Sequence, residues 1–507
     1  MWWKPKQRPV VDRWLILVTG AYAVLAILLF PKFQYHLQND SFAYLSLAAT
    51  HTGNPYWGPM LPRLIAMFTA LGISPLFAIR LPSILASVGL LILTGSSRKF
   101  LPLSRAVWNT LLLTLAVFLL TKTLDIATPD ILLTFLLALM MRFAVERTLL
   151  GAILAGLSAG LGYLTKSVAL PFFLLFSVLL LVRRLHSEPA KRKEALLSFG
   201  LSVFVCAFLI APWIATISLR HGGFTIGESA HIIHATMNPL QDHEIPMNVR
   251  GLLAPPSGVA LSVWDDPTTL EYHDWSPLSS GKNFMMQLKI IVINASRMID
   301  VVFREFWLAW AILGGAMVYA CGRKKDALTG WSRVTVAVWA MLLLMYLPIV
   351  TDDRYVWTGI VLLLATGALL LETVAEEFDW NGLQKKVALA VFFLAFTAYP
   401  GWRTLNAIDD GKRIAVDAVA AASVLKLQGS RTASDHWKLG LAFSYFSGAH
   451  YYGRPKNPAD GDATAAELKA HGIDTYIVTG KAPEIRGFKE ILTPAASVHI
   501  LRSVSAR

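Results

Sequence analysis

Residues 130–167 read D-I-L-L-T-F-L-L-A-L-M-M-R-F-A-V-E-R-T-L-L-G-A-I-L-A-G-L-S-A-G-L-G-Y-L-T-K-S. Two apolar runs, at 130–146 and 149–165, are separated by a short connection that contains Arg147, and Arg142 lies near the end of the first run. Each run approaches the ~20 residues that a helix needs to cross the hydrocarbon core of a bilayer. The stretch therefore predicts two membrane-spanning helices, with Asp130 and Lys166 at the same membrane face. Because the two runs are so closely spaced, the alternative that one span is merged or missed stays open.

The same pattern fills most of the 507 residues, which are 55% hydrophobic and 16% charged, with a mean hydropathy of +0.52. A soluble protein carries about 25% charged residues. The sequence predicts an α-helical polytopic membrane protein with about eleven transmembrane helices. Their expected ranges are 13–30, 76–96, 105–121, 130–146, 149–165, 168–184, 196–218, 299–320, 333–350, 355–373 and 386–403.

The formal net charge of +13 does not indicate a nucleic-acid partner, because the basic residues gather in short loops between apolar runs. Such loops face the cytoplasm. The N-terminus is basic and is followed by an apolar run without a small-residue cleavage site, which predicts an uncleaved first span. We therefore expect a multi-pass protein of the inner (plasma) membrane with a cytoplasmic N-terminus and an extracytoplasmic C-terminus. The basic loop residues are Lys4, Lys6, Arg8, Arg98, Lys99, Arg105, Arg142, Arg147, Arg183, Arg184, Lys191, Arg192, Lys193, Arg323, Lys324, Lys325, Arg333, Lys385 and Lys386.

Two domains are expected. Residues 1–404 form the multi-spanning part, with long outer loops at 31–75 and 219–298; the first loop holds short amphipathic stretches typical of interfacial helices. Residues 405–507 are predicted to form a small extracytoplasmic α/β domain. Its helices are expected at 417–427 and 463–471, and its strands at 443–447, 474–479 and 497–503.

Asp40, in Q-N-D-S-F-A-Y (38–44), follows the first span and is the first catalytic candidate. A carboxylate at a partly dry membrane boundary suits a general base, because burial raises a carboxyl pKa toward working pH. The alternative is a helix N-cap, since Asp before S-F-A-Y-L is a good capping signal.

Asp130, in T-P-D-I, is the second catalytic candidate. Its alternative is also structural: Thr128 can cap a helix, Pro129 suits a first turn, and an acid favours the helix N-terminus. Asp125 lies in the same short loop and is a weaker candidate.

Lys166 and Arg354 are expected at the same outer rim, where each could contact a phosphate. The alternative for Lys166 is snorkelling to the interface. For Arg354 it is pairing with the neighbouring Asp352 and Asp353.

No metal site is predicted. The outer loop carries His231, His234, His243 and His273 with Asp242, Glu244 and Asp274, but no convincing third-ligand pattern accompanies the H-x-x-H. Any cofactor is therefore unknown, and a divalent cation lacks a clear ligand set. Cys206 and Cys321 are too far apart in the expected topology for a disulfide. The chain has no Walker motif, no dinucleotide fingerprint and no G-x-S-x-G, which argues against ATP pumps, dinucleotide enzymes and α/β hydrolases.

These motifs together resemble the membrane glycosyltransferases of the GT-C class. The closest likeness is to the bacterial protein O-mannosyltransferases and lipid A aminoarabinose transferases (families 39 and 83). N-D-S-F-A-Y is similar to a D-E-x-x-Y motif through Asp40 and Tyr44, with Ser41 in place of the second acid. T-P-D-I-L-L-T-F (128–135), G-L-G-Y-L-T-K-S (160–167), A-P-W-I (211–214) and R-Y-V (354–356) also resemble family motifs.

One motif departs from the family. P-Y-W-G-P-M-L-P (55–62) has Trp57 and Gly58 where the aminoarabinose branch often has Glu-Lys. The metal and phosphate contacts of that branch are therefore not carried over to this chain.

The resemblance implies a hexosyl- or pentosyltransferase that moves a sugar from a polyprenyl-phosphate donor to an acceptor at the outer membrane face, with inversion. It implies catalytic roles for Asp40 and Asp130, and donor binding by Lys166, Arg354, Tyr44 and Tyr355. The acceptor can be a lipid, a glycan or a protein, as in lipopolysaccharide modification or protein O-glycosylation, and membrane lipids surround the chain. Two alternatives stay open: a transporter or flippase of lipid-linked sugars, and a non-catalytic cell-envelope assembly protein.

Overall fold

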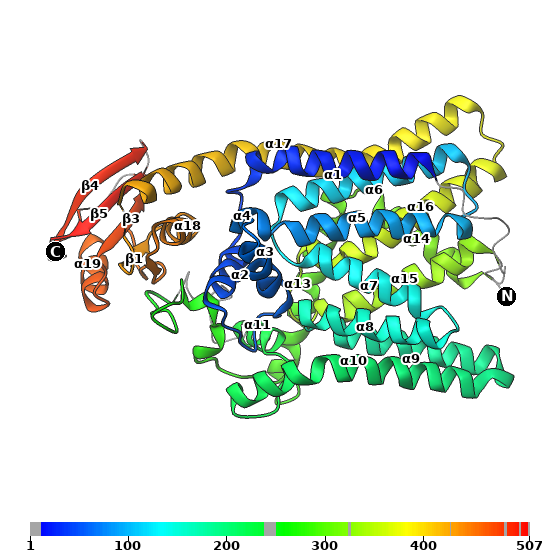
Figure 1. Cartoon of the computed structure of the whole chain (residues 1–507), viewed down its shortest axis with the longest axis horizontal. Coiled ribbons are helices and arrows are strands. Elements are labelled where there is room, and N and C mark those ends of the chain that lie inside the picture. The colour runs from blue at the N-terminus through cyan, green and yellow to red at the C-terminus, as the bar shows by residue number, and fades with distance from the viewer. Residues whose placement is uncertain are drawn as a thin grey trace.

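The computed structural model describes residues 12–237, 250–322, 326–425, 427–480, 484–495 and 498–504. The basic residues Lys4, Lys6, Arg8, Arg323, Lys324 and Lys325, and the loop residues Asp242, His243 and Glu244, lie outside this part. Long helices form a bundle, short helices cover one end of it, and a small sheet lies beyond them (Figure 1).

Each of the eleven predicted spans falls on a helix of the bundle, although the span predicted at 299–320 is divided between α14 and the end of the preceding helix, α13 (Gly281–Glu305). In chain order these are α1 (Arg13–Phe33), α5 (Leu81–Ser96), α6 (Arg105–Asp125), α7 (Asp130–Ala144), α8 (Leu149–Thr165), α9 (Ala169–Ser187), α10 (Arg192–His221), α14 (Ala309–Cys321), α15 (Ala327–Tyr346), α16 (Trp357–Glu377) and α17 (Gly382–Leu425). The short 3-10 turns η1 (Arg98–Phe100) and η2 (Pro189–Lys191) join neighbouring helices. The prediction of a polytopic α-helical membrane protein is confirmed.

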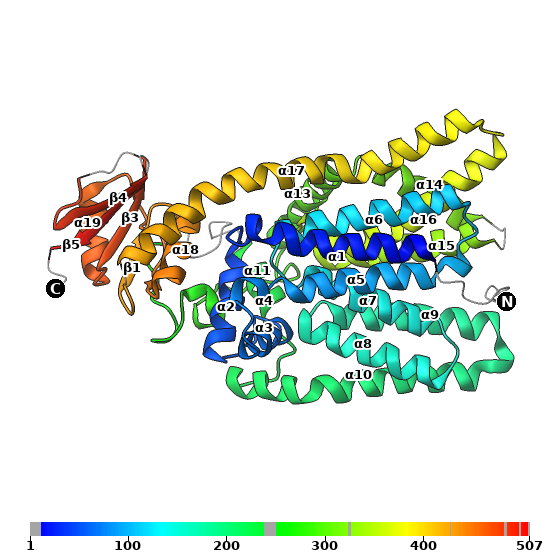
Figure 2. The same ribbon diagram turned by 45° about the horizontal axis from the view of Figure 1, so that its top comes forward.

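The count of eleven spans is not confirmed. Among the described residues, eight helices are long and apolar enough to cross a membrane, or nine if one bent pair counts as a span. The shortfall includes α7 and α8, which have 15 and 17 residues. Both helices still lie within the bundle (Figure 2). Residues 145–148 form the turn between them, so the first apolar run loses its last two residues to the connection, whereas α8 has the predicted bounds of 149–165.

The bent pair replaces the straight span that was predicted at 299–320. Helix α13 (Gly281–Glu305) meets α14 at an angle of 109°. The bend follows Glu305, whose carboxylate is buried against cationic side chains described below. Helix α13 also turns polar residues inward, because Gln287 and Asn294 donate to the carbonyls of Pro348 and Leu347 at 2.8 and 2.9 Å. The predicted outer loop therefore becomes helical from residue 281.

Apolar side chains on the outside of the bundle show why it suits a bilayer. On α1, Ile16, Leu17 and Leu28 are exposed, whereas Tyr22 and Ala26 pack into the core. The central helices α6 and α16 are buried on most sides. Exposure of these apolar side chains to water would be unfavourable, and contact with lipid removes this free-energy cost.

Short helices cover the bundle end that carries Asp40. They include α2 (Asn39–Thr50), α3 (Met60–Ala70) and α4 (Pro75–Ala78) from the first outer loop. The second outer loop supplies α11 (Ser229–Thr236), η3 (Val263–Asp265) and η4 (Pro267–Thr269), and η5 (Asp353–Val356) precedes α16. Helices of 12 and 11 residues, as in α2 and α3, are too short to span. The first outer loop therefore holds short helices and no further span, as predicted.

Helix α17 joins the bundle to the sheet. It runs along the bundle and continues past its end without a break at residue 404, where the second domain was expected to begin (Figures 1 and 2). The five-stranded sheet has the order β2-β1-β3-β5-β4. Strand β1 is parallel to β2 and β3, and β5 is antiparallel to β3 and β4. The strands are β1 (Arg431–Ser434), β2 (His450–Tyr451), β3 (Thr475–Thr479), β4 (Phe488–Ala495) and β5 (Val498–Ser503).

The helices of this domain correct one prediction. Residues 443–447, expected as a strand, belong to α18 (Trp437–Ser447). His436 caps this helix, and Gly448, with φ of +71°, ends it. Leu439, Leu441 and Phe443 are buried on several sides, so the helical period is hidden in a continuous apolar run. Helix α19 (Gly461–Ala470) and strands β3 and β5 agree with the predictions, whereas β1, β2 and β4 were not predicted.

Candidate active site

Asp40 lies in the first turn of α2, and its carboxylate binds residues from distant parts of the chain. Arg354 donates from Nη1 to Oδ2 at 2.9 Å, and Trp264 donates from Nε1 to Oδ1 at 3.3 Å. The N-cap residue of α2 is Gln38, whose backbone N–H donates to Ser41 Oγ at 3.1 Å. Helix capping therefore does not account for Asp40. Its side chain is 20% exposed, so a ligand can reach the carboxylate.

Asp130 begins α7 and is far less accessible, with only 2% of its side chain exposed. Lys166 donates from Nζ to Oδ1 at 2.6 Å, and Thr128 donates from Oγ1 to Oδ2 at 2.6 Å. Lys166 is the C-cap residue of α8. Because α7 and α8 are antiparallel neighbours, the start of one and the end of the other meet at the same membrane face.

Arg354 joins the two carboxylates into one cluster. Besides its hydrogen bond to Asp40, its Nη1 lies 3.8 Å from Asp130 Oδ2. Its Nε donates to Asp352 Oδ2 at 3.1 Å. The expected pairing of Arg354 with its neighbours is therefore correct for Asp352. The four charged residues that the sequence singled out, Asp40, Asp130, Lys166 and Arg354, all lie in this cluster.

Aromatic rings border the charged cluster. Lys166 Nζ and Arg354 Cζ lie 5.1 and 5.4 Å from the centre of the Tyr355 ring, which stacks on Tyr346 at 4.4 Å. Tyr44 is buried and meets Trp57 edge to face at 4.9 Å. Burial, with the charges of Asp40 and Asp130, raises the pKa of Tyr44 well above its usual value. The Tyr44 hydroxyl therefore stays protonated at ordinary pH, so that the side chain can line the site or donate a hydrogen bond.

The second outer loop supplies a site residue that the sequence analysis missed. Trp264 closes over Asp40, and its position depends on the next residue, Asp265. Asp265 Oδ2 accepts hydrogen bonds from Ser46 Oγ at 2.5 Å and from the backbone N–H of Leu261 at 2.7 Å. Burial raises the pKa of Asp265 to about 7. A tryptophan in a three-residue 3-10 turn of a long loop carries no local sequence signal of this role.

The C-terminal domain holds this loop in place. The backbone N–H of Tyr451 in β2 donates to Leu261 O at 2.7 Å, and Leu253 N–H donates to Tyr452 O at 2.7 Å. Phe42 in α2 also packs against Tyr445 of α18, with ring centres 5.5 Å apart. The sheet edge and α18 therefore support the two segments that carry Trp264 and Asp40.

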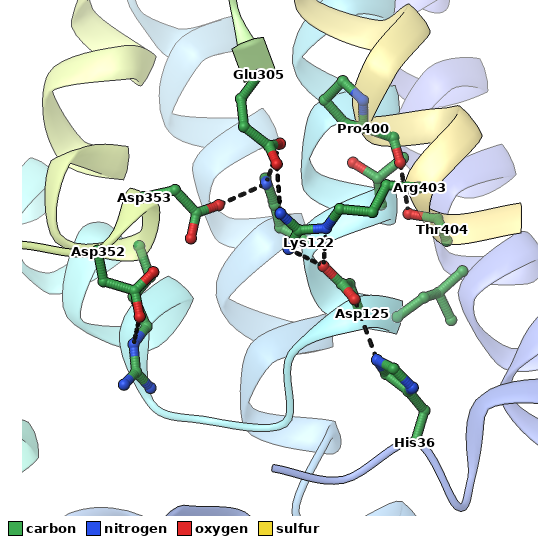
Figure 3. Close-up of polar contacts among 12 residues, drawn as sticks. His36, Lys122, Asp125, Glu305, Asp352, Asp353, Pro400, Arg403 and Thr404 are labelled. Atoms are coloured by element: carbon green, nitrogen blue, oxygen red, sulfur yellow. Dashed lines mark hydrogen bonds and ion pairs between the residues drawn. The ribbon is translucent and has the colours of Figure 1, made fainter. Parts of the chain in front are cut away.

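A second charged network lies beside the cluster and joins residues of α6, α13, η5 and α17 (Figure 3). Lys122, with a side chain 1% exposed, donates to Glu305 Oε2 at 2.8 Å and to Asp353 Oδ2 at 2.7 Å. Arg403 of α17 pairs with Glu305 and Asp125, and His36 Nε2 lies 3.2 Å from Asp125 Oδ1. The weaker candidate Asp125 therefore belongs to this network. Because Asp353 precedes Arg354, the network fixes the turn that presents Arg354 to Asp40.

The outer-loop histidines have partners of their own. His231 bonds Glu228 and Asp274, at 2.9 Å each, and His234 bonds Gln287 at 2.9 Å. Within the described ranges, no group of three or more His, Cys, Asp or Glu side chains could hold a metal ion. Cys206 and Cys321 are both free thiols.

Residues 54–215 match the family model described as dolichyl-phosphate-mannose-protein mannosyltransferase. This match covers less than half of the chain. No curated protein sequence matches significantly. The chain is similar to the crystal structure of ArnT from Cupriavidus metallidurans bound to undecaprenyl phosphate. The two share 14% identity over 98% of this chain and 99% of that one, with a TM-score of 0.52. The chain has the GT-C fold.

Two further structures cover a similar share of this chain at lower similarity. One is ArnT from Cupriavidus metallidurans in the apo state, with 13% identity over 97% of this chain and 98% of that one, and a TM-score of 0.47. The other is the arabinofuranosyltransferase AftD from Mycobacteria, with 11% identity over 98% of this chain and 42% of that one, and a TM-score of 0.44. The GT-C resemblance of the sequence motifs is thus confirmed for the fold through the ArnT complex.

Proposed function

We propose that this protein is an integral-membrane glycosyltransferase that moves a sugar from a polyprenyl-phosphate donor to an acceptor at the outer membrane face. One observation carries the proposal. Asp40, Asp130, Lys166 and Arg354 come from four separate segments and meet as alternating acids and cations at one end of a GT-C bundle. The ArnT structure with undecaprenyl phosphate supports a polyprenyl-phosphate donor for a chain with the same fold.

In the proposed reaction, Asp40 takes the proton from the acceptor hydroxyl as that oxygen attacks the anomeric carbon. The bond between that carbon and the phosphate oxygen breaks, and attack from the opposite side inverts the configuration. A phosphate is a good leaving group, so one base suffices where glycoside hydrolysis uses an acid and a base. Asp40 suits the base because it is the more accessible of the two acids.

Lys166 and Arg354 would stabilise the charge that develops on the departing phosphate. Both already hold carboxylates, so a bound phosphate would compete with Asp40 and Asp130 for their N–H donors. Asp130 then acts as a support that orients Lys166. Tyr355, beneath both cations, and Tyr44, beside Asp40, would border the donor.

The test is turnover by folded Asp40→Asn. Mass spectrometry of membrane lipids and surface glycans, with and without the protein, identifies the product and hence the sugar and acceptor. Base catalysis contributes about 10²–10⁴-fold, so Asp40→Asn should lose at least about a hundredfold in turnover. Asp274→Asn is the matched control, because Asp274 lies on the outer loop and is 69% exposed.

Two results would overturn the proposal. The first is an unchanged lipid and glycan profile without the protein, which would favour a non-catalytic assembly protein. The second is that removing the protein abolishes transport of a lipid-linked sugar across the membrane but leaves sugar transfer unchanged in permeabilised membranes. This result would favour a flippase. Normal turnover by Asp40→Asn would instead reject only the assignment of the base.

A further inference from the structure

A cavity opens at the bundle end opposite the charged cluster. It has a volume of about 210 Å³ and lies among α5, α6, α7, α9, α15 and α16. Apolar side chains form its walls, including Leu90, Leu111, Met141, Phe176, Val334 and Leu364. On α7 and its C-cap the lining residues run from Ala138 to Val145, which corresponds to about 10 Å along the helix axis. The space is therefore a slot that enters the bundle from its end.

The mouth of the slot is cationic. Arg142 from the last turn of α7 and Arg183 from α9 both line it. Phe100 also lines it, and the Phe100 ring lies 4.8 Å from Lys99 Nζ and 5.7 Å from Arg142 Cζ. Glu146 pairs with Arg142 at 2.6 Å and offsets one charge. Arg183 is exposed, and among the described residues no acidic side chain lies within ion-pair distance of it.

An apolar slot with arginines at its mouth matches one kind of occupant from a bilayer. An acyl chain fits the walls, where each buried methylene contributes about 0.8 kcal/mol. A headgroup phosphate fits the guanidinium groups, which bind phosphate in a bidentate manner. Basic pockets between membrane helices bind anionic lipid headgroups in this way.

We propose that this cavity is a binding site for an anionic phospholipid of the leaflet opposite the sugar-transfer site. The phosphate lies between Arg142 and Arg183, and one acyl chain enters between α7 and α16. The site is separate from the charged cluster around Asp40, and it holds whether or not the protein is a glycosyltransferase. A bound lipid fills the gap between helices and stabilises the folded bundle by mass action.

The experiment measures lipid binding to the purified, delipidated full-length protein by native mass spectrometry. Phosphatidylglycerol and phosphatidylcholine with identical acyl chains are compared, so that the lipids differ only in the headgroup, which is anionic in the first and zwitterionic in the second. We expect phosphatidylglycerol to bind more tightly and to raise the unfolding temperature. The double variant Arg142→Gln/Arg183→Gln should bind it about tenfold more weakly or worse, since a tenfold loss corresponds to only one charge-assisted hydrogen bond.

A control variant separates the site from general surface charge. Arg105→Gln/Arg192→Gln removes the same number of cations from the same bundle end without touching the cavity, and it should bind phosphatidylglycerol normally.

Two further experiments test the slot itself. Ala138→Phe places a ring in the slot and should reduce binding of both lipids. A phosphatidylglycerol with a photoreactive acyl chain should label cavity-lining peptides within 90–101, 138–145 and 361–365 of the unmodified protein, which tests the site without any variant.

Several outcomes would overturn the proposal. Equal affinity for the two lipids, or equal loss in the Arg142→Gln/Arg183→Gln and Arg105→Gln/Arg192→Gln variants, would leave no specific headgroup site. Acyl-chain labelling confined to other peptides would place the lipid elsewhere. Displacement of the photoreactive lipid from these peptides by undecaprenyl phosphate would assign the slot to a prenyl chain instead.

Discussion

Arg354, in the turn before α16, donates a hydrogen bond to Asp40 in α2 across 2.9 Å, although 314 residues separate the two. The contact connects the first outer loop with the turn before α16, in the last third of the sequence. It also means that the group proposed to bind phosphate already holds the group proposed as base. Donor binding and release of the Asp40 carboxylate are therefore linked in the proposed reaction.

The first prediction concerns the two cations. Arg354→Ala and Lys166→Ala should each weaken binding of undecaprenyl phosphate by about ten- to a hundredfold, the range expected for a charge-assisted hydrogen bond. Arg354→Lys should restore only part of the loss, because a lysine lacks the bidentate geometry. Arg63→Ala, at an exposed arginine on α3, is the control. Normal binding by folded Arg354→Ala and Lys166→Ala proteins would place the anionic site elsewhere.

How far the sequence predicts this site can be judged from particular residues. The sequence identifies four charged residues of the site because each lies near an end of an apolar run: Asp40, Asp130, Lys166 and Arg354. The alternating basic loops place all four on one membrane face. The contacts between residues could not be predicted, since Trp264 lies in a three-residue turn of the outer loop and reaches Asp40 only through long-range folding. Lys122 and Glu305 were missed as a pair because hydropathy treats buried charges as ends of spans.

The fold shows the same division. Long apolar runs predict helices well, but α13 was missed because its apolar and polar faces average out along the sequence. Helix α18 was missed for the opposite reason, because it is buried around most of its circumference and shows no period.

The second prediction concerns the buried network. Lys122→Met should destabilise the protein strongly, because it leaves Glu305 and Asp353 buried without their cation. Breaking a buried pair in this way costs about 3–5 kcal/mol. Arg304→Ala is the matched control, since it removes an exposed, solvent-screened pair with Asp300 on α13 and should leave the unfolding midpoint nearly unchanged. Thermal unfolding in detergent compares the two; equal midpoints would show that Lys122 is not important for stability.

The third prediction is a pH dependence that arises from Asp265. Its pKa is about 7 in the folded protein against an ordinary value of 3.8, so between these values the folded state binds more protons than the unfolded state. Stability contributed by this group therefore falls as the pH rises through this window, and it levels off above about pH 7. Asp265→Asn cannot ionise and should lack this decline. The unfolding temperature of Asp265→Asn minus that of the native protein should grow from pH 5 to pH 8; a constant difference would contradict the shift.

The fourth prediction concerns orientation. The sheet and the Asp40 cluster lie toward one end of the bundle, and the basic turns that contain Arg98, Arg147 and Lys191 lie at the other (Figure 1). Basic loops face the cytoplasm, so the C-terminal domain should be extracytoplasmic. A reporter that is active only in the cytoplasm, fused after the last residue, should be silent. The same reporter fused in the turn at 145–148 should be active; the reverse pattern would invert the topology.

The last prediction separates the roles of the two acids. Asp130→Asn keeps the shape of the side chain but removes its charge, so Lys166 loses its ion-pair partner and is less well oriented. If Asp130 is a support, Asp130→Asn should lower turnover less than Asp40→Asn does, and the loss should come with weaker binding of undecaprenyl phosphate. Asp40→Asn should lower turnover while donor binding is retained or strengthened, because Arg354 is then released from a carboxylate. Both proteins must first show native unfolding temperatures, since Asp130 is buried and paired. A larger turnover loss in Asp130→Asn, with donor binding unchanged, would exchange the two roles and make Asp130 the base.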